Sequence, residues 1–122
     1  MSAAQQDEEV RSWVTAAMDG ADDKLARRTE AFFVGEVMGI TDWFVVTSGS
    51  NPRQVRAIVE NVEEAVFLAD GPKPRSIEGL DEMSWVLMDF GEFVVHVFSE
   101  EAREYYDLER LWADVPRLER TA

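Results

Sequence analysis

The sequence predicts an α/β fold, in which a single mixed sheet of about five strands is flanked by helices. Two long segments carry apolar residues at helical spacing, and shorter apolar segments of strand type follow each of them. Glycine and proline separate these segments. Because the chain has 122 residues, 46% of them hydrophobic, we expect one domain (1–122) with one core.

The first helix is predicted over Asp7–Arg27. Acidic residues at its start suit the positive end of the helix dipole, and Gly20 weakens its middle slightly. The sequence leaves open whether the polar residues 1–9 are ordered. The apolar positions at spacings of three and four are Val10, Trp13, Val14, Ala17, Ala21 and Leu25.

Two strands are predicted next, over Ala31–Val34 and Trp43–Thr47. Gly35 and Gly39 mark the connection between them, because glycine commonly interrupts regular structure.

A second helix is predicted over Pro52–Ala69. Asn51 is a favourable N-cap, and proline is well tolerated at the first helical position. Gly71 followed by Pro72 ends this helix. The linker that follows leads into a short strand near Arg75–Ile77.

The segment "SWVLMDFGEFVVHVF" predicts a β-hairpin around Phe90-Gly91, and a final helix follows with Ser99 as its N-cap. Both sets of alternating hairpin residues are largely apolar. Such strands are either covered on both faces or present one face to a partner. The two sets are Trp85, Leu87, Val95 and Val97, and Val86, Met88, Val94, His96 and Phe98.

The charge balance indicates the kind of partner. With 25 acidic and 12 basic residues, the chain has a formal net charge of −13. Such a surface repels DNA, RNA and anionic membranes, and it suits a basic protein; the alternative is that the charge serves solubility alone. The start of the chain lacks the layout of a secretory signal, and the apolar runs are too short to span a bilayer. We therefore expect a soluble, cytoplasmic protein.

The stretch "VVTSGSNPRQV", Val45–Val55, has the small residues of a phosphate-binding loop at a strand-to-helix junction. It lacks the lysine of a P-loop and the third glycine of a dinucleotide site. Nucleotidyl transfer would also need two carboxylates on a nearby strand to hold magnesium, and the hairpin provides Asp89 alone. The pattern therefore favours a structural turn, with Gly49 turning the chain and Asn51 capping the helix.

His96 is the only histidine, and the chain has no cysteine. A metal site would need ligands from elsewhere, and a serine nucleophile would need an orienting acid and a nucleophile elbow. A hydrogen-bonded, half-buried histidine is the simpler interpretation. We expect no catalytic, cofactor-binding or metal site.

Aromatic and charged residues interleave near the C-terminus. Such mixtures are typical of the energetic centre of a protein interface, while the alternative is that the aromatic residues are core. The aromatic residues are Trp85, Phe90, Tyr105, Tyr106 and Trp112, and the charged ones are Asp89, Glu92, Glu109 and Arg110.

From about Val10 to Arg117 the chain resembles the ribosomal silencing factor family, also called Iojap-like. The resemblance rests on "DKLARRTEAFFV", "TDWFVVTSGSNPRQVRAIVENVEEAV" and "IEGLDEMSWVLMDFGEFVVHVFSEEAREYYDLERLWADVPR". It implies a nucleotidyltransferase-like shape without the catalytic acids, and no enzymatic activity. Family members often form homodimers in isolation.

The resemblance further implies binding to the large ribosomal subunit through a basic protein of its intersubunit face, the fourteenth in the large-subunit numbering. Joining of the small subunit would be blocked sterically, either in starvation or during subunit assembly. The alternative is a protein-interaction module that does not act on ribosomes. The residues expected to contact the partner are Trp85, Asp89, Phe90, Glu92, Tyr106, Glu109 and Trp112.

Three residues depart from the family pattern. Phe33 stands where the family commonly has Asp, which puts in doubt any role for a carboxylate on the first strand. Trp43 and Phe90 stand where Tyr is common, and Phe90 removes a hydroxyl and one hydrogen bond.

Overall fold

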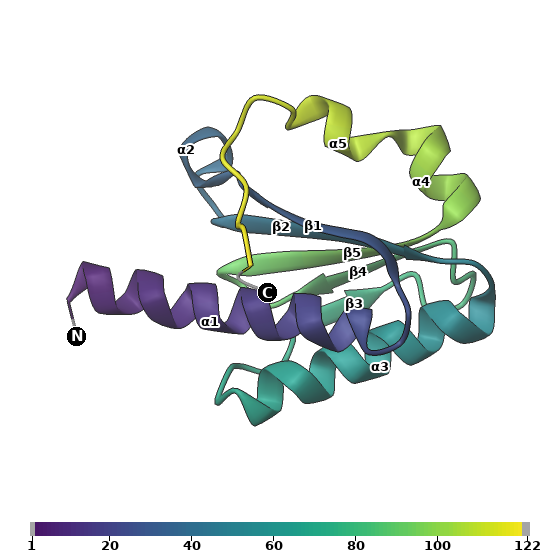
Figure 1. The fold of residues 1–122 in the computed structure, drawn as a ribbon, viewed down its shortest axis with the longest axis horizontal. Coiled ribbons are helices and arrows are strands. Elements are labelled where there is room, and N and C mark those ends of the chain that lie inside the picture. The colour runs from purple at the N-terminus through teal and green to yellow at the C-terminus, as the bar shows by residue number, and fades with distance from the viewer. Residues whose placement is uncertain (1, 121–122) are drawn as a thin grey trace.

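The computed structural model describes residues 2–120 and confirms the α/β fold (Figure 1). The strands form one mixed sheet in the order β1-β2-β5-β4-β3, in which β2 and β5 are parallel and the other neighbours are antiparallel. The strands are β1 (Arg27–Phe33), β2 (Trp43–Gly49), β3 (Ser76–Glu78), β4 (Trp85–Asp89) and β5 (Phe93–Ser99).

Helices lie on both faces of the sheet. Figure 1 shows α1 and α3 together below it, with α4 and α5 above it. None of the helices in residues 2–120 is long and apolar enough to cross a membrane. The helices are α1 (Ala3–Asp22), α2 (Gly35–Met38), α3 (Pro52–Leu68), α4 (Glu100–Tyr106) and α5 (Leu108–Leu111).

The first helix begins and ends earlier than predicted. Ser2 and Gln5 form a reciprocal capping box, so the helix starts at Ala3 rather than at the acidic Asp7. At the other end the chain turns after Asp22, and Leu25 has a φ of 62° and is 79% exposed. Leu25 therefore does not belong to the apolar stripe, contrary to the prediction.

Gly20 allows α1 and α3 to approach closely. A Cβ at this position would lie 2.7 Å from Cβ of Ala65 on α3. The amide Nδ2 of Asn61 also donates a hydrogen bond to the Gly20 carbonyl at 2.7 Å. The glycine that weakens the helix by itself is thus what permits the contact between the two helices.

The register of the hairpin corrects the grouping of its residues. Trp85 pairs with Phe98, and Leu87 pairs with His96, so these four side chains share one face of the sheet. Val95 and Val97 lie on the opposite face, because each pairs with a residue of the alternate set, Met88 and Val86.

The two faces of the sheet are covered unequally. The larger core cluster lies between the sheet and the α1–α3 pair, and includes Val45, Val62, Met88 and Val95. The cluster on the other face is smaller and is built around Phe44, Phe98 and Phe32. Because α4 and α5 are short, part of this second face lies beyond their reach.

The C-terminal segment covers the outer edge of β1, as Figure 1 shows. The Phe33 amide donates to the Pro116 carbonyl at 2.8 Å, and the Leu118 amide donates to the Ala31 carbonyl at 3.0 Å. Arg120 then forms ion pairs with Asp19 and Asp22 of α1, each at 2.7 Å. An exposed edge invites pairing with other chains, and this segment removes that opportunity along β1.

Candidate docking face on the sheet

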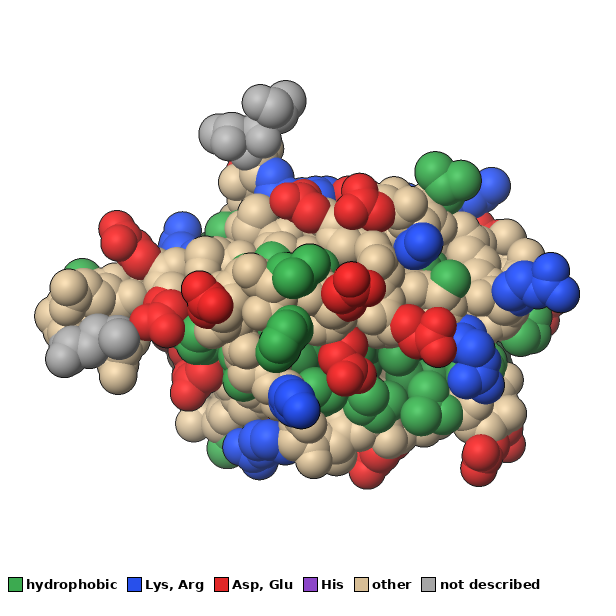
Figure 2. Space-filling view, turned by 90° about the horizontal axis from the view of Figure 1, so that it is seen from below, with side chains coloured by type: hydrophobic (Ala, Val, Ile, Leu, Met, Phe, Trp, Pro, Cys, Tyr) green, Lys and Arg blue, Asp and Glu red, His purple; other side chains and the backbone are tan. Residues whose placement is uncertain are grey.

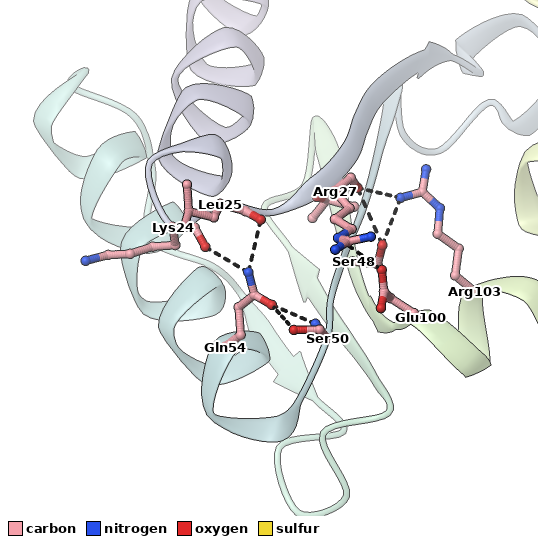
Figure 3. Close-up of polar contacts among 9 residues, drawn as sticks. Lys24, Leu25, Arg27, Ser48, Ser50, Gln54, Glu100 and Arg103 are labelled. Atoms are coloured by element: carbon pink, nitrogen blue, oxygen red, sulfur yellow. Dashed lines mark hydrogen bonds and ion pairs between the residues drawn. The ribbon is translucent and has the colours of Figure 1, made fainter.

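The Thr-Ser-Gly-Ser segment joins the end of β2 to α3, and hydrogen bonds within the protein hold it in place (Figure 3). The side-chain oxygen of Gln54 accepts hydrogen bonds from the Ser50 amide at 2.6 Å and from its hydroxyl at 2.9 Å. The amide nitrogen of Gln54 donates to the carbonyls of Lys24 and Leu25, both at 3.0 Å. Groups that would cradle a phosphate are thus used to join the end of α1 to the start of α3.

The same junction is tied to α4 by Arg103, whose side chain is 1% exposed. Its guanidinium donates to the carbonyls of Arg27 at 2.8 Å and Arg28 at 2.7 Å, and to Oγ of Ser48 at 3.2 Å. Nε donates to Glu109 at 3.0 Å. A cation in this position holds α4 and α5 onto the sheet.

The geometry of the carboxylates offers little for metal chemistry. Asp89 accepts a hydrogen bond from the Gly91 amide at 2.8 Å and lies 3.9 Å from Arg75. Within residues 2–120, no three His, Asp or Glu side chains gather as a metal ion would require.

The part of the second sheet face that α4 and α5 leave uncovered is called here the open face. Its floor is formed by Phe44, Leu87, Val94 and His96, and the connection that follows α2 borders it through Ile40. Leu87 and Val94 are half-buried, while Ile40 is 82% exposed. Of the two alternatives that the sequence left open for the hairpin, full cover on both faces does not hold, because Leu87 and Val94 are only half-buried.

His96 lies on the floor of the open face and is 4% exposed. The indole Nε1 of Trp85 donates to its Nδ1 at 3.1 Å, and the Phe44 ring packs edge-on against it with centroids 4.6 Å apart. Burial lowers the pKa of His96 from 6.5 to about 4, so the ring is neutral at physiological pH.

Four of the seven residues expected at the partner surface lie along the border of the open face with α4 and α5. The Trp85 and Tyr106 rings are 4.7 Å apart, and Trp112 packs edge-on against Phe44 at 5.6 Å. Tyr106 is 51% exposed, whereas Trp85 and Trp112 are half-buried. Glu109 joins this border, but its carboxylate is bound to Arg103.

The other three predicted residues are dispersed. Asp89 lines the open face, whereas Glu92 lines a separate cavity beside Asp7 and Glu9 of α1. Phe90 is 3% exposed and stacks on Phe93 in the α1–α3 core, with ring centroids 4.6 Å apart. Its side chain is therefore not available at the surface, because the tight hairpin turn directs it to the opposite face.

Phe33 and Trp43, the other two residues that depart from the family pattern, also lie at the α1–α3 core. Phe33 packs edge-on against Trp43 with ring centroids 5.2 Å apart, and Trp43 is 4% exposed. Both side chains contribute to the α1–α3 core rather than to a polar site.

Sequence reasoning overlooked the exposed apolar side chains of α2 and of the residues that follow it. Val37 and Ile40 are 67% and 82% exposed, and Met38 lies between them. The signal was present in "GEVMGI", where two apolar residues lie between the glycines and a third follows the second glycine. Three exposed apolar residues this close together form a candidate contact surface.

Charge is distributed over the α1–α3 side of the molecule (Figure 2). Acidic side chains are spread across this face, with basic ones scattered between them. An acidic cavity between Glu60, Glu63 and Phe67 on α3 adds to this character.

The family model "Ribosomal silencing factor during starvation" matches residues 7–122. The silencing factor RsfS of Halalkalibacterium halodurans is 37% identical over 103 residues, covering 84% of this chain and 87% of that protein. A mouse protein named for mitochondrial assembly of the ribosomal large subunit is 40% identical over 80 residues, covering 62% of this chain and 34% of its own length.

A crystal structure from Bacillus halodurans superposes with a TM-score of 0.73 at 34% identity, covering 87% of this chain and 95% of that one. The fold, the matched residues and these identities agree over most of the sequence. The chain therefore belongs to the ribosomal silencing factor family.

Proposed function

We propose that this protein binds the large ribosomal subunit through a basic protein of the intersubunit face and sterically prevents the small subunit from joining. It acts as an obstacle rather than a catalyst, and so represses translation. Family membership supports the link to the ribosome. The net charge of −13 supports a protein contact rather than an RNA contact.

The observation that carries the proposal is the open face. It combines half-buried apolar strand residues, the exposed Ile40 and the carboxylate of Asp89. Trp85 and Tyr106 flank it with large aromatic surfaces, which often supply most of the binding energy at protein interfaces. An apolar centre with an aromatic margin and the Asp89 carboxylate at its edge suits a protein surface that carries basic groups.

An enzymatic alternative has less support. The candidate phosphate-binding groups of the Ser-Gly-Ser junction are engaged by Gln54 and Arg103. The neighbouring sheet residues supply Asp89 without the second carboxylate that nucleotidyl transfer needs.

Sedimentation with purified large subunits tests the proposal. The wild-type protein is expected to co-sediment with large subunits and to lower the yield of joined ribosomes. Ile40→Glu is expected to weaken binding at least about ten-fold, because it places a charge at the apolar margin. Phe67→Glu is the matched control, since Phe67 is also exposed (61%) but lies on α3, on the other side of the molecule.

Protein that stays at the top of the gradient in the presence of free large subunits would contradict the function. Equal losses in both variants would instead move the contact away from the open face. Sedimentation of the free protein also gives its mass, which tests the expected homodimer.

A further inference from the structure

The open face contains a cavity of about 220 Å³ between the strands and the connection after α2. Its walls include the apolar side chains of Ile40, Phe44, Leu87 and Val94, the uncharged polar residues Thr41 and His96, and the charged pair Arg75 and Asp89. Both uncharged polar residues are more than nine-tenths buried, with exposed fractions of 8% and 4%.

Thr41 and His96 carry buried polar atoms without partners. Oγ1 of Thr41 and Nε2 of His96 have no hydrogen-bond partner among residues 2–120. The indole nitrogen of Trp85 can only donate, so Nδ1 of His96 must be the acceptor in their hydrogen bond. In the neutral ring the proton consequently resides on Nε2, which is left as an unused donor.

An unpaired buried donor is unfavourable, and native proteins contain few of them. Because both residues line one cavity, a ligand held there is placed to supply the partners that the chain does not. A cation does not suit an N–H donor, and Asp89 lies 3.9 Å from Arg75, so the cavity has no uncompensated positive charge to hold an anion. A neutral carbonyl accepts from N–H and O–H groups, and an apolar body beside it suits the remaining walls.

We propose that this cavity is a specificity subsite that receives an apolar segment of the partner protein, whose carbonyl oxygen accepts a hydrogen bond from Nε2 of His96 or Oγ1 of Thr41. This inference rests on the proposed function and adds the chemistry of the contact. A protein is the fitting source, because the cavity opens beside the 82% exposed Ile40, an apolar margin that a folded partner can cover.

Thr41→Val tests the subsite, because it removes the hydroxyl and preserves the shape of the side chain. We expect affinity for large subunits to fall about ten-fold, the effect of losing one hydrogen bond of about 1.4 kcal/mol. The melting temperature should not fall, because the hydroxyl has no partner within the described chain. Thr15→Val on α1 is the matched control and should leave both quantities unchanged.

A second measurement uses a probe in place of the ribosome. N-methylpyrrolidone carries one carbonyl on a small apolar ring, and a dissociation constant on the order of 1–10 mM is reasonable for its size. In protein labelled with ¹⁵N-histidine, the probe should shift the Nε2–H signal of His96 to lower field. Thr41→Val should weaken this response.

The two measurements separate the possible failures. If the wild type binds large subunits, but Thr41→Val binds equally well and the probe leaves the His96 signal unchanged, the subsite is wrong while the proposed function stands. If the wild type does not bind large subunits, the proposed function is wrong and the probe decides the subsite. In that case an unchanged His96 signal in 50 mM probe, about five times the weakest expected dissociation constant, would rule the subsite out.

Discussion

The carboxylate of Glu109 lies 3.0 Å from Nε of Arg103, inside the molecule rather than at its surface. Glu109 was expected to attract a basic partner, and its side chain is only 18% exposed. Its position shows that this acid neutralises a buried guanidinium. The pair fixes α5 to α4, and the remaining donors of Arg103 fix α4 to β1 and β2.

Arg103→Met should lower the free energy of unfolding by about 3 kcal/mol, because it leaves Glu109 unpaired and removes the charged donor to the Arg27 and Arg28 carbonyls and to Ser48. Urea denaturation followed by circular dichroism measures this change. Arg110→Met is the control, since Arg110 is exposed on α5, and should change stability by less than about 0.5 kcal/mol. Similar stabilities of the two variants would contradict the structural role of Arg103.

Gln54→Ala should lower the free energy of unfolding by about 1–2 kcal/mol, because the Ser50 amide and the carbonyls after α1 lose their partner. Arg53→Ala is the neighbouring control, as Arg53 is exposed. Thermal unfolding of the two variants makes the comparison. A wild-type stability for Gln54→Ala would mean that the junction is held by other contacts.

His96 should make the protein less stable in acid. The pKa of His96 is lowered to about 4 in the folded protein, whereas the unfolded chain titrates near 6.5. Between these values the unfolded state binds more protons, so stability falls as the pH drops through this window. From pH 7 to pH 4.5 the contribution is about 2 kcal/mol.

This contribution is isolated by comparison with His96→Phe. The variant loses the acceptor for Trp85 at every pH, so that loss cancels when each protein is compared with itself at the two pH values. Wild type should lose about 2 kcal/mol more than the variant between pH 7 and pH 4.5 in urea titrations. An equal pH dependence would show that His96 is not buried in its neutral form.

The sequence predicted the fold because its local signals agree. Asn51 and Pro52 predicted the start of α3, and Asn51 does accept from the Gln54 amide at 2.8 Å. The strand β1 was predicted too short, since it begins in the charged residues Arg27 and Arg28, whose pairing depends on β2 and Arg103. The β-strand propensity of individual residues does not reveal such long-range pairing.

The candidate site was less predictable for the same reason. Alternation along the hairpin showed two apolar sets, but only the register reveals that Trp85 shares a face with His96. Aromatic composition could not separate Phe90, which is core, from Tyr106, which is exposed. The role of Glu109 likewise depends on Arg103, six positions away and on another helix.

Asp89 should accelerate association with the large subunit, because a carboxylate at the open face attracts a basic partner. Asp89→Asn removes the charge and retains an oxygen able to accept from the Gly91 amide. Stopped-flow binding at low salt should give an association rate about two- to three-fold slower than wild type, and the difference should vanish near 1 M salt. Glu63→Gln on α3 is the matched control, because it removes the same charge on the other side of the molecule. An equal slowing by both variants would mean that net charge, rather than the open face, steers the encounter.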